Sequence, residues 1–227
     1  MTRLLTSLLL LTGLLLGQQT LASDATPTAA PQTSATLSPR DTISQAVERM
    51  TARLTKEHDR LVKDPDYASK LVSQELDGLV DFKRITRLVM GDWFAKASRD
   101  QKYRFLDVFK QSLIDTYASG VTLYQGQKIT VLPMRDGDIK GDRAFVRMEM
   151  TTNSGKQIPV AYTMILNDSH WQVENLIVNG LNLGKTFRDQ FAQSAETYKG
   201  NLDQVIDHWA EQLKASQGLE KATEAAK

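Results

Sequence analysis

The feature that most constrains the fold is a run of four segments, between residues 127 and 178, in which apolar and polar residues alternate. The segments read QKITVLPMR, RAFVRMEMTT, QIPVAYTMILN and HWQVENLIV, and this period of two is typical of strands with one buried face. The links DGDIKGD, NSGK and NDS are short and carry Gly, Asp or Asn, as tight turns require. Short links join antiparallel neighbours, so we expect a meander of four to five strands.

Helical patterns precede the strands. Ser38 and Pro39 resemble an N-cap and a first helical residue, and the helix that they begin should end at Pro65. Its apolar face is formed by Ile43, Val47, Met50, Leu54 and Leu61. Two short helices should follow, separated near Gly78, with Asp81 capping the second. A capping box at Ser98 and Gln101 then predicts a helix that ends at Gly120.

Two further amphipathic segments follow the strands. FRDQFAQSAETY and LDQVIDHWAEQL both repeat apolar residues at helical spacing. Helices therefore come before and after an antiparallel meander. This order predicts an α+β fold in which several helices pack on one face of a curved sheet.

The expected inward face of the sheet is apolar and unusually rich in methionine. In the second strand segment the inward residues are Ala144, Val146, Met148 and Met150, and in the third they are Ile158, Val160, Tyr162, Met164 and Leu166. Arg143, Arg147 and Glu149 should point to the other face. Methionine is flexible, so it suits a surface that adapts to variable apolar shapes, but it also fills irregular gaps in an ordinary core. Spacing alone leaves both interpretations open.

The termini predict export and a single ordered domain. Arg3, the apolar run Leu4–Leu16 and the small residues before Ala22 are typical of a signal peptide, which we expect to be cleaved so that residues 1–22 are lost. Residues 23–37 should form a flexible linker, residues 38–215 one α+β domain, and residues 216–227 a frayed polar tail. With no cysteine in the chain, stability must come from an ordinary core rather than from disulfides.

Charge and motifs argue against several classes of function. The 28 basic residues nearly balance 27 acidic ones, which does not favour nucleic acid as a partner. The three histidines are far apart, so we expect no metal site. NGLNLGKT, residues 179–186, ends like a phosphate-binding loop, but its first glycine is one position late and its leucines suit a strand-to-helix turn better. We therefore expect no enzyme and no catalytic residues.

Four segments of the chain resemble a known family. They are VDFKRITRLVMGDWFAKAS, FLDVFKQSLIDTY, GKQIPVAYTMIL and WQVENLIVNGLNLGKTFRDQF, in this order between about Leu71 and Leu213. Together they are similar to the periplasmic phospholipid-shuttle family, Mla-pathway component C, also called the toluene-tolerance auxiliary family. The resemblance implies an exported periplasmic carrier that moves glycerophospholipids between the outer and inner membranes and so maintains outer-membrane lipid asymmetry.

The resemblance also implies a site and partners. Acyl chains would lie in an apolar pocket between sheet and helices with the headgroup outside, and phospholipid would be cargo rather than a cofactor. Partners would be an inner-membrane ABC transporter complex with a hexameric lipid-binding ring and an outer-membrane lipoprotein–porin complex, with the carrier itself a monomer. The expected pocket residues are Val80, Ile85, Leu88, Val89, Phe105, Phe109, Leu113, Val131, Val146, Met148, Met150, Val160, Tyr162, Met164, Val173 and Ile177.

Two other classes of function stay open at this point. A periplasmic chaperone for lipidated or unfolded polypeptides could use a similar apolar concavity. An enzyme on this fold would need a buried acid or base, and a register error of one residue would turn Glu149 or Glu174 inward.

Overall fold

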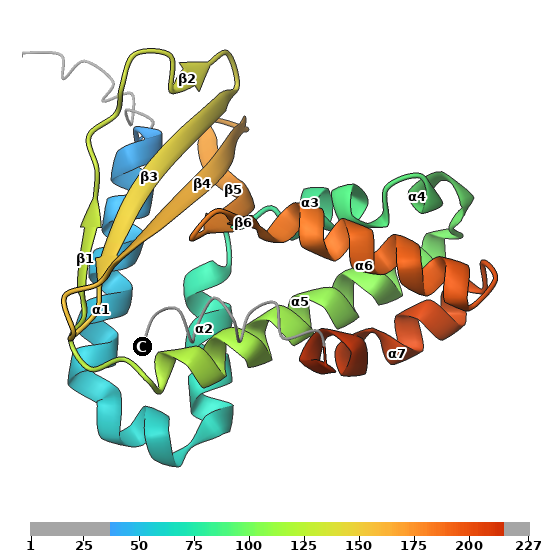
Figure 1. The fold of residues 1–227 in the computed structure, drawn as a ribbon, viewed down its shortest axis with the longest axis horizontal. Helices are drawn as coiled ribbons and strands as arrows, with labels where there is room; N and C mark the ends of the chain where they lie inside the picture. The colour runs from blue at the N-terminus through green and yellow to red at the C-terminus, as the bar shows by residue number, and fades with distance from the viewer. Residues whose placement is uncertain (1–36, 216–227) are drawn as a thin grey trace, which may run out of the picture. The chain divides into compact units, whose positions relative to one another are not determined.

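The computed structural model describes residues 37–215, and the predicted signal peptide, nearly all of the predicted linker and the predicted tail lie outside that range. Figure 1 shows the arrangement of the elements. The helices are α1 (Pro39–Lys63), α2 (Pro65–Leu76), α3 (Phe82–Met90), α4 (Trp93–Lys96), α5 (Arg99–Val121), α6 (Leu183–Thr197) and α7 (Leu202–Ala215). The strands are β1 (Lys128–Val131), β2 (Ile139–Lys140), β3 (Arg143–Thr151), β4 (Gln157–Asn167), β5 (His170–Val178) and β6 (Leu181–Asn182).

The strands form one antiparallel sheet in the order β1, β3, β4, β5, β6, with β2 also paired to β3. The predicted α+β fold is therefore confirmed. The sheet has six strands rather than four or five, because β2 and β6 are two-residue strands that are too short to show a period. No described helix has the length and apolar character needed to cross a membrane.

The helix starts follow the capping residues. The Ser38 side chain accepts a hydrogen bond from the backbone N–H of Asp41 (3.1 Å), and Asp81 accepts one from that of Arg84 (2.9 Å). Ser98 and Gln101 bond each other's backbone N–H groups, which completes the capping box. Each of these contacts satisfies a donor that the first helical turn leaves free.

A β-bulge interrupts the pairing of β4 with β5. Thr163 lies opposite Asn175 and Met164 lies opposite Val173, so Glu174 is an extra residue on β5. Because side chains alternate along a strand, one extra residue reverses the order of faces beyond it. Val173 and Leu176 consequently share the inward face.

The helical part has two buried cores of its own. One joins α3, α5, α6 and α7 around Phe105, Phe109, Phe191 and Trp209. The other joins α1, α2 and α5 around residues such as Leu61. The inward face of the sheet packs against α1, which therefore contacts both the sheet and the helical part.

Candidate apolar binding site

The inward face of the sheet divides into two zones. In the first, which we call the sealed zone, α1 covers the strands through Ile43, and Val146 is 0% exposed. The sealed zone consists of Ala144, Val146, Met164, Trp171 and Val173. These side chains are fully packed, so this zone is ordinary core.

The second zone stays partly uncovered. Its buried centre is Met148, Ile158 and Val160, and around them lie half-buried apolar residues. We call the buried centre and the half-buried residues together the open zone. The half-buried residues are Ile129, Val131, Met150, Tyr162, Leu176 and Val178, with Val47 of α1. Val131, Met148, Val160 and Val178 are direct cross-strand neighbours, so they form a continuous apolar row across four strands.

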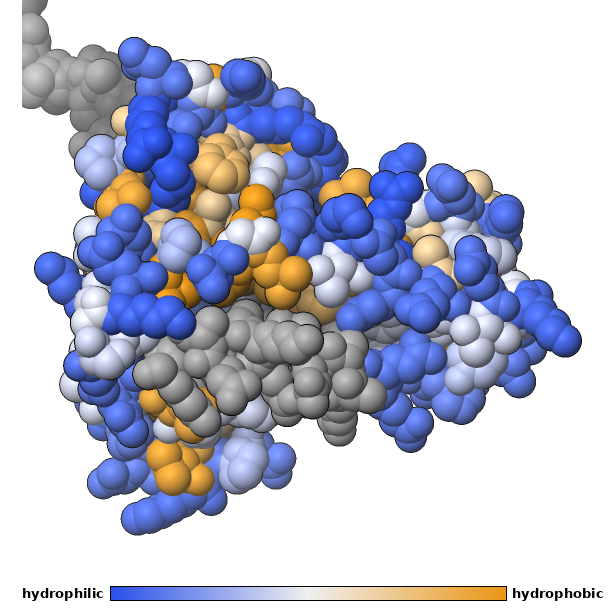
Figure 2. Space-filling model, viewed as in Figure 1, coloured by the Kyte–Doolittle hydropathy of each residue, from blue (hydrophilic) through white to orange (hydrophobic). Residues whose placement is uncertain are grey.

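Hydrophobic residues are unevenly distributed over the surface of the molecule. Figure 2 shows hydrophobic residues gathered on the half of this face that is formed by the sheet and α1, whereas the half formed by α6 and α7 is mostly hydrophilic. Apolar side chains that keep accessible surface together, rather than singly, are typical of places where another apolar body binds. The open zone is therefore the candidate site.

The helical phenylalanines lie elsewhere than expected. Phe105 packs edge-on against Phe191 (4.7 Å between ring centroids) and Trp209 (5.1 Å), and Phe109 packs edge-on against Phe187 (5.5 Å). The structure places Ile85, Val89 and Leu113 in the same helical core, away from the methionines of the sheet. Among the predicted residues that precede the sheet, Val80 packs against both this helical core and the sealed zone, and it forms an isolated β-bridge with Val173.

Two residues that the sequence predicted to line the apolar pocket lie elsewhere in the structure. Leu88 is 45% exposed on α3. Ile177 lies opposite Ala161 and Asn182, on the face that carries Arg147, because the bulge at Glu174 reverses the faces of β5. We therefore leave both residues out of the proposed lining.

Sequence reasoning also missed residues that the structure brings to the site. Ile43 and Val47 of α1 cover the sheet, and their spacing of four already indicated a common helical face. Leu176 and Val178 join the open zone to the helical core. The bulge that turns them inward has no simple sequence signal, since β5 reads as a regular strand.

Two tyrosines mark a desolvated environment at the site. Burial raises the pKa of the Tyr162 phenol to about 12. Burial also raises the pKa of the Tyr117 phenol on α5, and the nearby Tyr162 raises it further. The Tyr162 hydroxyl lies 3.9 Å from Met148 Sδ, at the limit of a weak contact. The surroundings of both phenols are therefore apolar although both side chains keep some accessible surface.

A buried carboxylate on β5 is neutralised by arginines. Glu174 is 4% exposed, its Oε2 accepts a hydrogen bond from Arg84 of α3, and its Oε1 lies 3.3 Å from Arg143 Nη1. Arg143 belongs to the outward face of β3, so the carboxylate is drawn away from the open zone. Its role here is to tie α3 to the sheet, and Glu149 remains on the outward face as predicted.

The loop that resembled a phosphate-binding loop is closed by protein contacts. The backbone N–H of Gly184 donates to Asn175 Oδ1 (2.9 Å), and that of Lys185 donates to Asn182 Oδ1 (3.0 Å). A Cβ at Gly184 would come within 2.5 Å of Asn175 Oδ1, so a larger residue would have to displace this side chain. Two backbone donors at the start of α6 are thereby occupied by side chains rather than free for phosphate. Among residues 37–215 no group of three or more His, Cys, Asp or Glu residues could hold a metal ion.

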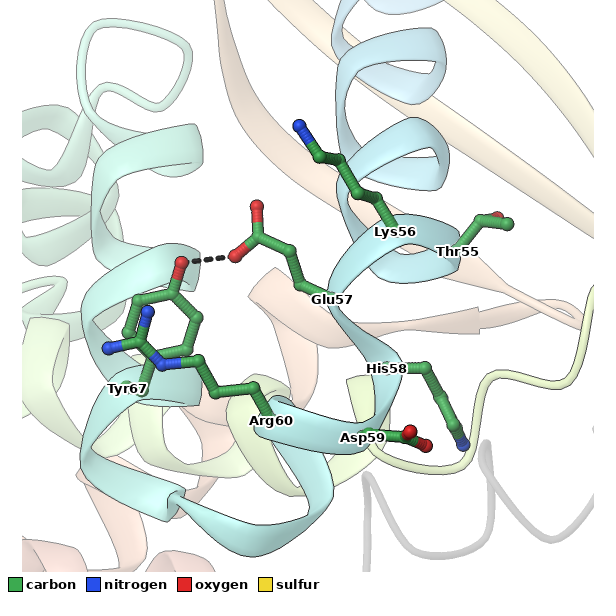
Figure 3. A pocket seen from close by; sticks show the side chains of 7 residues that line it. All are labelled: Thr55, Lys56, Glu57, His58, Asp59, Arg60 and Tyr67. Atoms are coloured by element: carbon green, nitrogen blue, oxygen red, sulfur yellow. Dashed lines mark hydrogen bonds between the residues drawn. The ribbon is translucent and has the colours of Figure 1, made fainter.

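Two surface hollows lie along α1, away from the methionines of the sheet. The larger, of about 640 Å³, is drawn in Figure 3 and is lined mostly by polar side chains of α1, with Tyr67 from α2. Tyr67 donates a hydrogen bond to Glu57, which lowers the pKa of that carboxyl, and the Arg60 guanidinium lies 3.5 Å from the centre of the Tyr67 ring. The smaller, of about 480 Å³, is lined by Glu48, Thr51, Ala52, Thr55, Lys56 and Tyr124.

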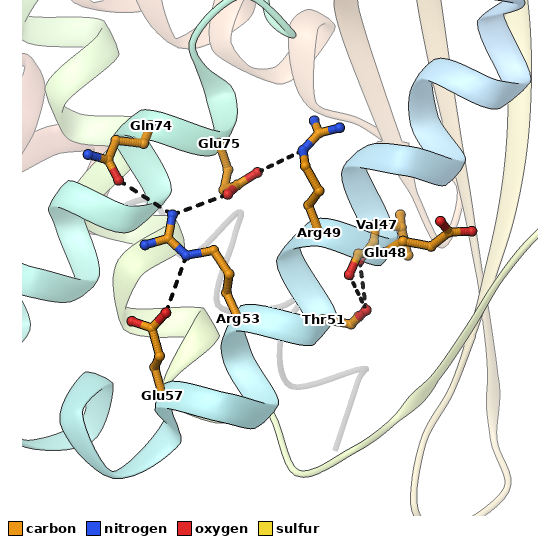
Figure 4. A network of polar contacts seen from close by, with 8 residues as sticks. All are labelled: Val47, Glu48, Arg49, Thr51, Arg53, Glu57, Gln74 and Glu75. Carbon is orange, nitrogen blue, oxygen red and sulfur yellow. Dashed lines mark hydrogen bonds and ion pairs between the residues drawn. The ribbon is translucent and has the colours of Figure 1, made fainter.

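A polar network fixes α1 on α2 beside these hollows (Figure 4). Arg53 lies between Glu57 (3.5 Å) and Glu75 (3.3 Å), and Arg49 reaches the other oxygen of Glu75 (3.5 Å). The C-terminal half of α1 is thus held by ion pairs, while its N-terminal half covers the sheet.

Comparison with known proteins identifies the family. The model of the MlaC protein family matches residues 44–211. The chain is also 34% identical over 194 residues to the toluene tolerance protein ttg2D of Pseudomonas putida, covering 85% of this chain and 89% of that protein. The chain belongs to the MlaC family. Within the family it is 24% identical over 113 residues, 50% of this chain and 51% of the relative, to the intermembrane phospholipid transport system binding protein MlaC of Haemophilus influenzae.

A solved structure shares the MlaC-family fold. It is the phospholipid-binding protein of Ralstonia solanacearum in complex with a phospholipid, with a TM-score of 0.71 and 24% identity, covering 79% of this chain and 98% of that one. The resemblance to this family that the four sequence segments indicated is therefore confirmed.

Proposed function

We propose that this MlaC-family chain is a periplasmic carrier that binds the acyl chains of glycerophospholipids against the open zone and carries the lipids between the two membranes. The observation that carries the proposal is the open zone itself, in which a row of apolar side chains crosses four strands and is surrounded by apolar residues that the described helices leave half-buried. The names of the relatives, which refer to phospholipid transport and binding, support the same cargo.

Burial of the acyl chains explains the need for a carrier. Exposing acyl chains to water costs about 0.8 kcal/mol per methylene, so one chain of roughly sixteen carbons would cost on the order of 13 kcal/mol. An apolar site in place of the bilayer interior removes most of this cost. Transfer to a second membrane is then close to balanced, which suits exchange with partners.

The partners implied by the family fit this exchange. We infer that the carrier meets an inner-membrane ABC transporter complex with a hexameric lipid-binding ring and an outer-membrane lipoprotein–porin complex. The headgroup would remain outside the apolar site. We also infer a non-enzymatic role, since the buried carboxylate of Glu174 is engaged by Arg84 and Arg143.

Two adjacent residues of β5 provide a matched test. Leu176→Trp adds bulk to the open zone, whereas Ile177→Trp adds the same bulk on the outward face. Lipid that copurifies with each folded variant is extracted and quantified. We expect the Leu176→Trp protein to lose most of its lipid and the Ile177→Trp protein to keep it. Equal lipid content in both variants, each with a native circular dichroism spectrum, would exclude the open zone as the lipid site. Copurified polypeptide in place of lipid would favour a chaperone.

A further inference from the structure

Cations gather on aromatic rings around the short helix α4. The Lys102 Nζ atom lies 4.6 Å from the centre of the Phe94 ring, and the Arg87 guanidinium lies 5.6 Å from the same ring. The Lys96 Nζ atom lies 4.3 Å from the Trp93 ring. Side chains from α3, α4 and α5 therefore converge on one place.

Two more cations extend this surface. The Arg99 guanidinium lies 5.7 Å from the ring of Tyr103, which is 52% exposed. Lys199 is exposed in the turn between α6 and α7, and the next residue, Gly200, contacts the Trp93 ring so closely that a Cβ would come within 3.3 Å of it. We call this surface the α4 patch: Arg87, Lys96, Arg99, Lys102 and Lys199, with Trp93, Phe94 and Tyr103.

The charges of the α4 patch are not balanced by ion pairs. Within the described part of the chain none of its five cations lies within ion-pairing distance of a carboxylate, whereas the neighbouring Arg84 and Arg104 are paired with Glu174 and with Asp203 and Asp207. Only Asp92 and Asp100 are acidic between residues 87 and 103. Over residues 87–103, four cations and two carboxylates leave a local charge of +2, in a chain whose formal net charge is only +1.

We propose that the α4 patch docks on the surface of an anionic bilayer. Lys and Arg can rest their aliphatic stems on apolar surface while their charges reach lipid headgroups, and Trp and Tyr are the residues that favour the membrane interface. Lysine is depleted at protein–protein interfaces, yet three of the five cations here are lysines. Each basic residue near such a surface adds attraction that weakens with salt.

This docking goes beyond the proposed cargo site. Figure 1 shows α4 at the end of the helical part that lies away from the sheet, so the open zone and the α4 patch are separate surfaces. A carrier held near a bilayer by one surface could keep the other free for lipid.

The test uses the mature chain and vesicles of stated composition. Protein is sedimented with vesicles of phosphatidylcholine alone or of phosphatidylcholine with phosphatidylglycerol, at low and at physiological salt. We expect binding only to the phosphatidylglycerol vesicles, weakened by salt, and a reduction of at least about tenfold for the double variant K96E/K102E. Tyr103→Ser should weaken binding by a smaller factor.

The control reverses two exposed lysines, one on β2 and one in the turn before β4, in the double variant K140E/K156E, which should leave vesicle binding unchanged. Equal sedimentation of both double variants would overturn the proposal. It would also be overturned if the unaltered chain did not bind phosphatidylglycerol vesicles at low salt. The second result would point to an acidic protein as the partner of the α4 patch. The lipid bound to K96E/K102E, measured by native mass spectrometry, should equal that of the unaltered protein. A loss of vesicle binding is thereby distinguished from a failure of the cargo site.

Discussion

Arg147 shows how a single side chain on the outward face of the sheet organises its surroundings. The guanidinium donates two hydrogen bonds to Asp138, one of them at 2.9 Å from Nη1 to Oδ1, and the backbone N–H of Arg135 donates to Asp138 Oδ2 at 2.6 Å. Arg147 is therefore engaged in fixing the loop before β2. It is not a free cation available for a partner.

This contact predicts a pH dependence of stability. The hydrogen bonds from Arg147 hold the pKa of the Asp138 carboxyl below its usual range. A carboxyl whose pKa is lower in the folded state stabilises the fold above its unfolded pKa of about 3.9, and this stabilisation is lost as the pH falls through the folded pKa. We expect Asp138→Asn to lower the free energy of unfolding at neutral pH by about 1 to 2 kcal/mol.

Urea unfolding between neutral and acidic pH measures this effect. The difference between the unaltered protein and Asp138→Asn should shrink as the pH falls below about 4. Asp136→Asn, an exposed neighbour, is the control and should change little. A difference that stays constant with pH would show that the charge of Asp138 is not what stabilises the loop.

At the scale of elements, α5, α6 and α7 are held together mainly by aromatic side chains that they share. Phe105, Phe109, Phe187, Phe191 and Trp209 form a set of mutually packed rings with centroids 4.7 to 6.0 Å apart. Such pairs contribute beyond the area that they bury. This core is filled, so its phenylalanines should serve stability rather than lipid binding.

Phe109→Ala tests this assignment. The side chain is fully buried, so its truncation should lower the free energy of unfolding by about 3 to 5 kcal/mol, measured by urea unfolding of delipidated protein. The amount of lipid per folded molecule should stay the same. If lipid content fell while stability changed by less than about 1 kcal/mol, Phe109 would belong to the lipid site after all.

The elements also show what could be predicted from the sequence. Ser38, Asp81 and Ser98 cap helices as expected, because capping depends on contacts within a few residues. The inward residues of β3 followed from alternation, and they pair with the inward residues of β4. Periodicity identifies which face of a helix is buried but not its partner, so the pairing of α5 with α6 and α7 was not foreseen. The bulge at Glu174 has no local signal, and this is why Ile177 was assigned to the wrong face.

At the scale of the whole molecule, the filled helical core provides stability, and the partly uncovered sheet provides an apolar surface. The helical core and the ion pairs of Arg53 with Glu57 and Glu75 hold the helices together. The sheet offers an apolar face that α1 covers at the sealed zone and, through Val47, reaches at the edge of the open zone. In the proposed carrier, flexible side chains such as Met148 and Met150 would adapt to acyl chains of different length.

The central claim is that the open zone holds the acyl chains of phospholipids, and native mass spectrometry of the purified protein tests it most directly. The protein is measured as purified, and the species that dissociate are extracted and analysed. We predict bound masses that match mixed diacyl phospholipids, which would also count the chains held. An apo mass that persists after incubation with phospholipid vesicles would contradict the account and would mean that the open zone is ordinary core.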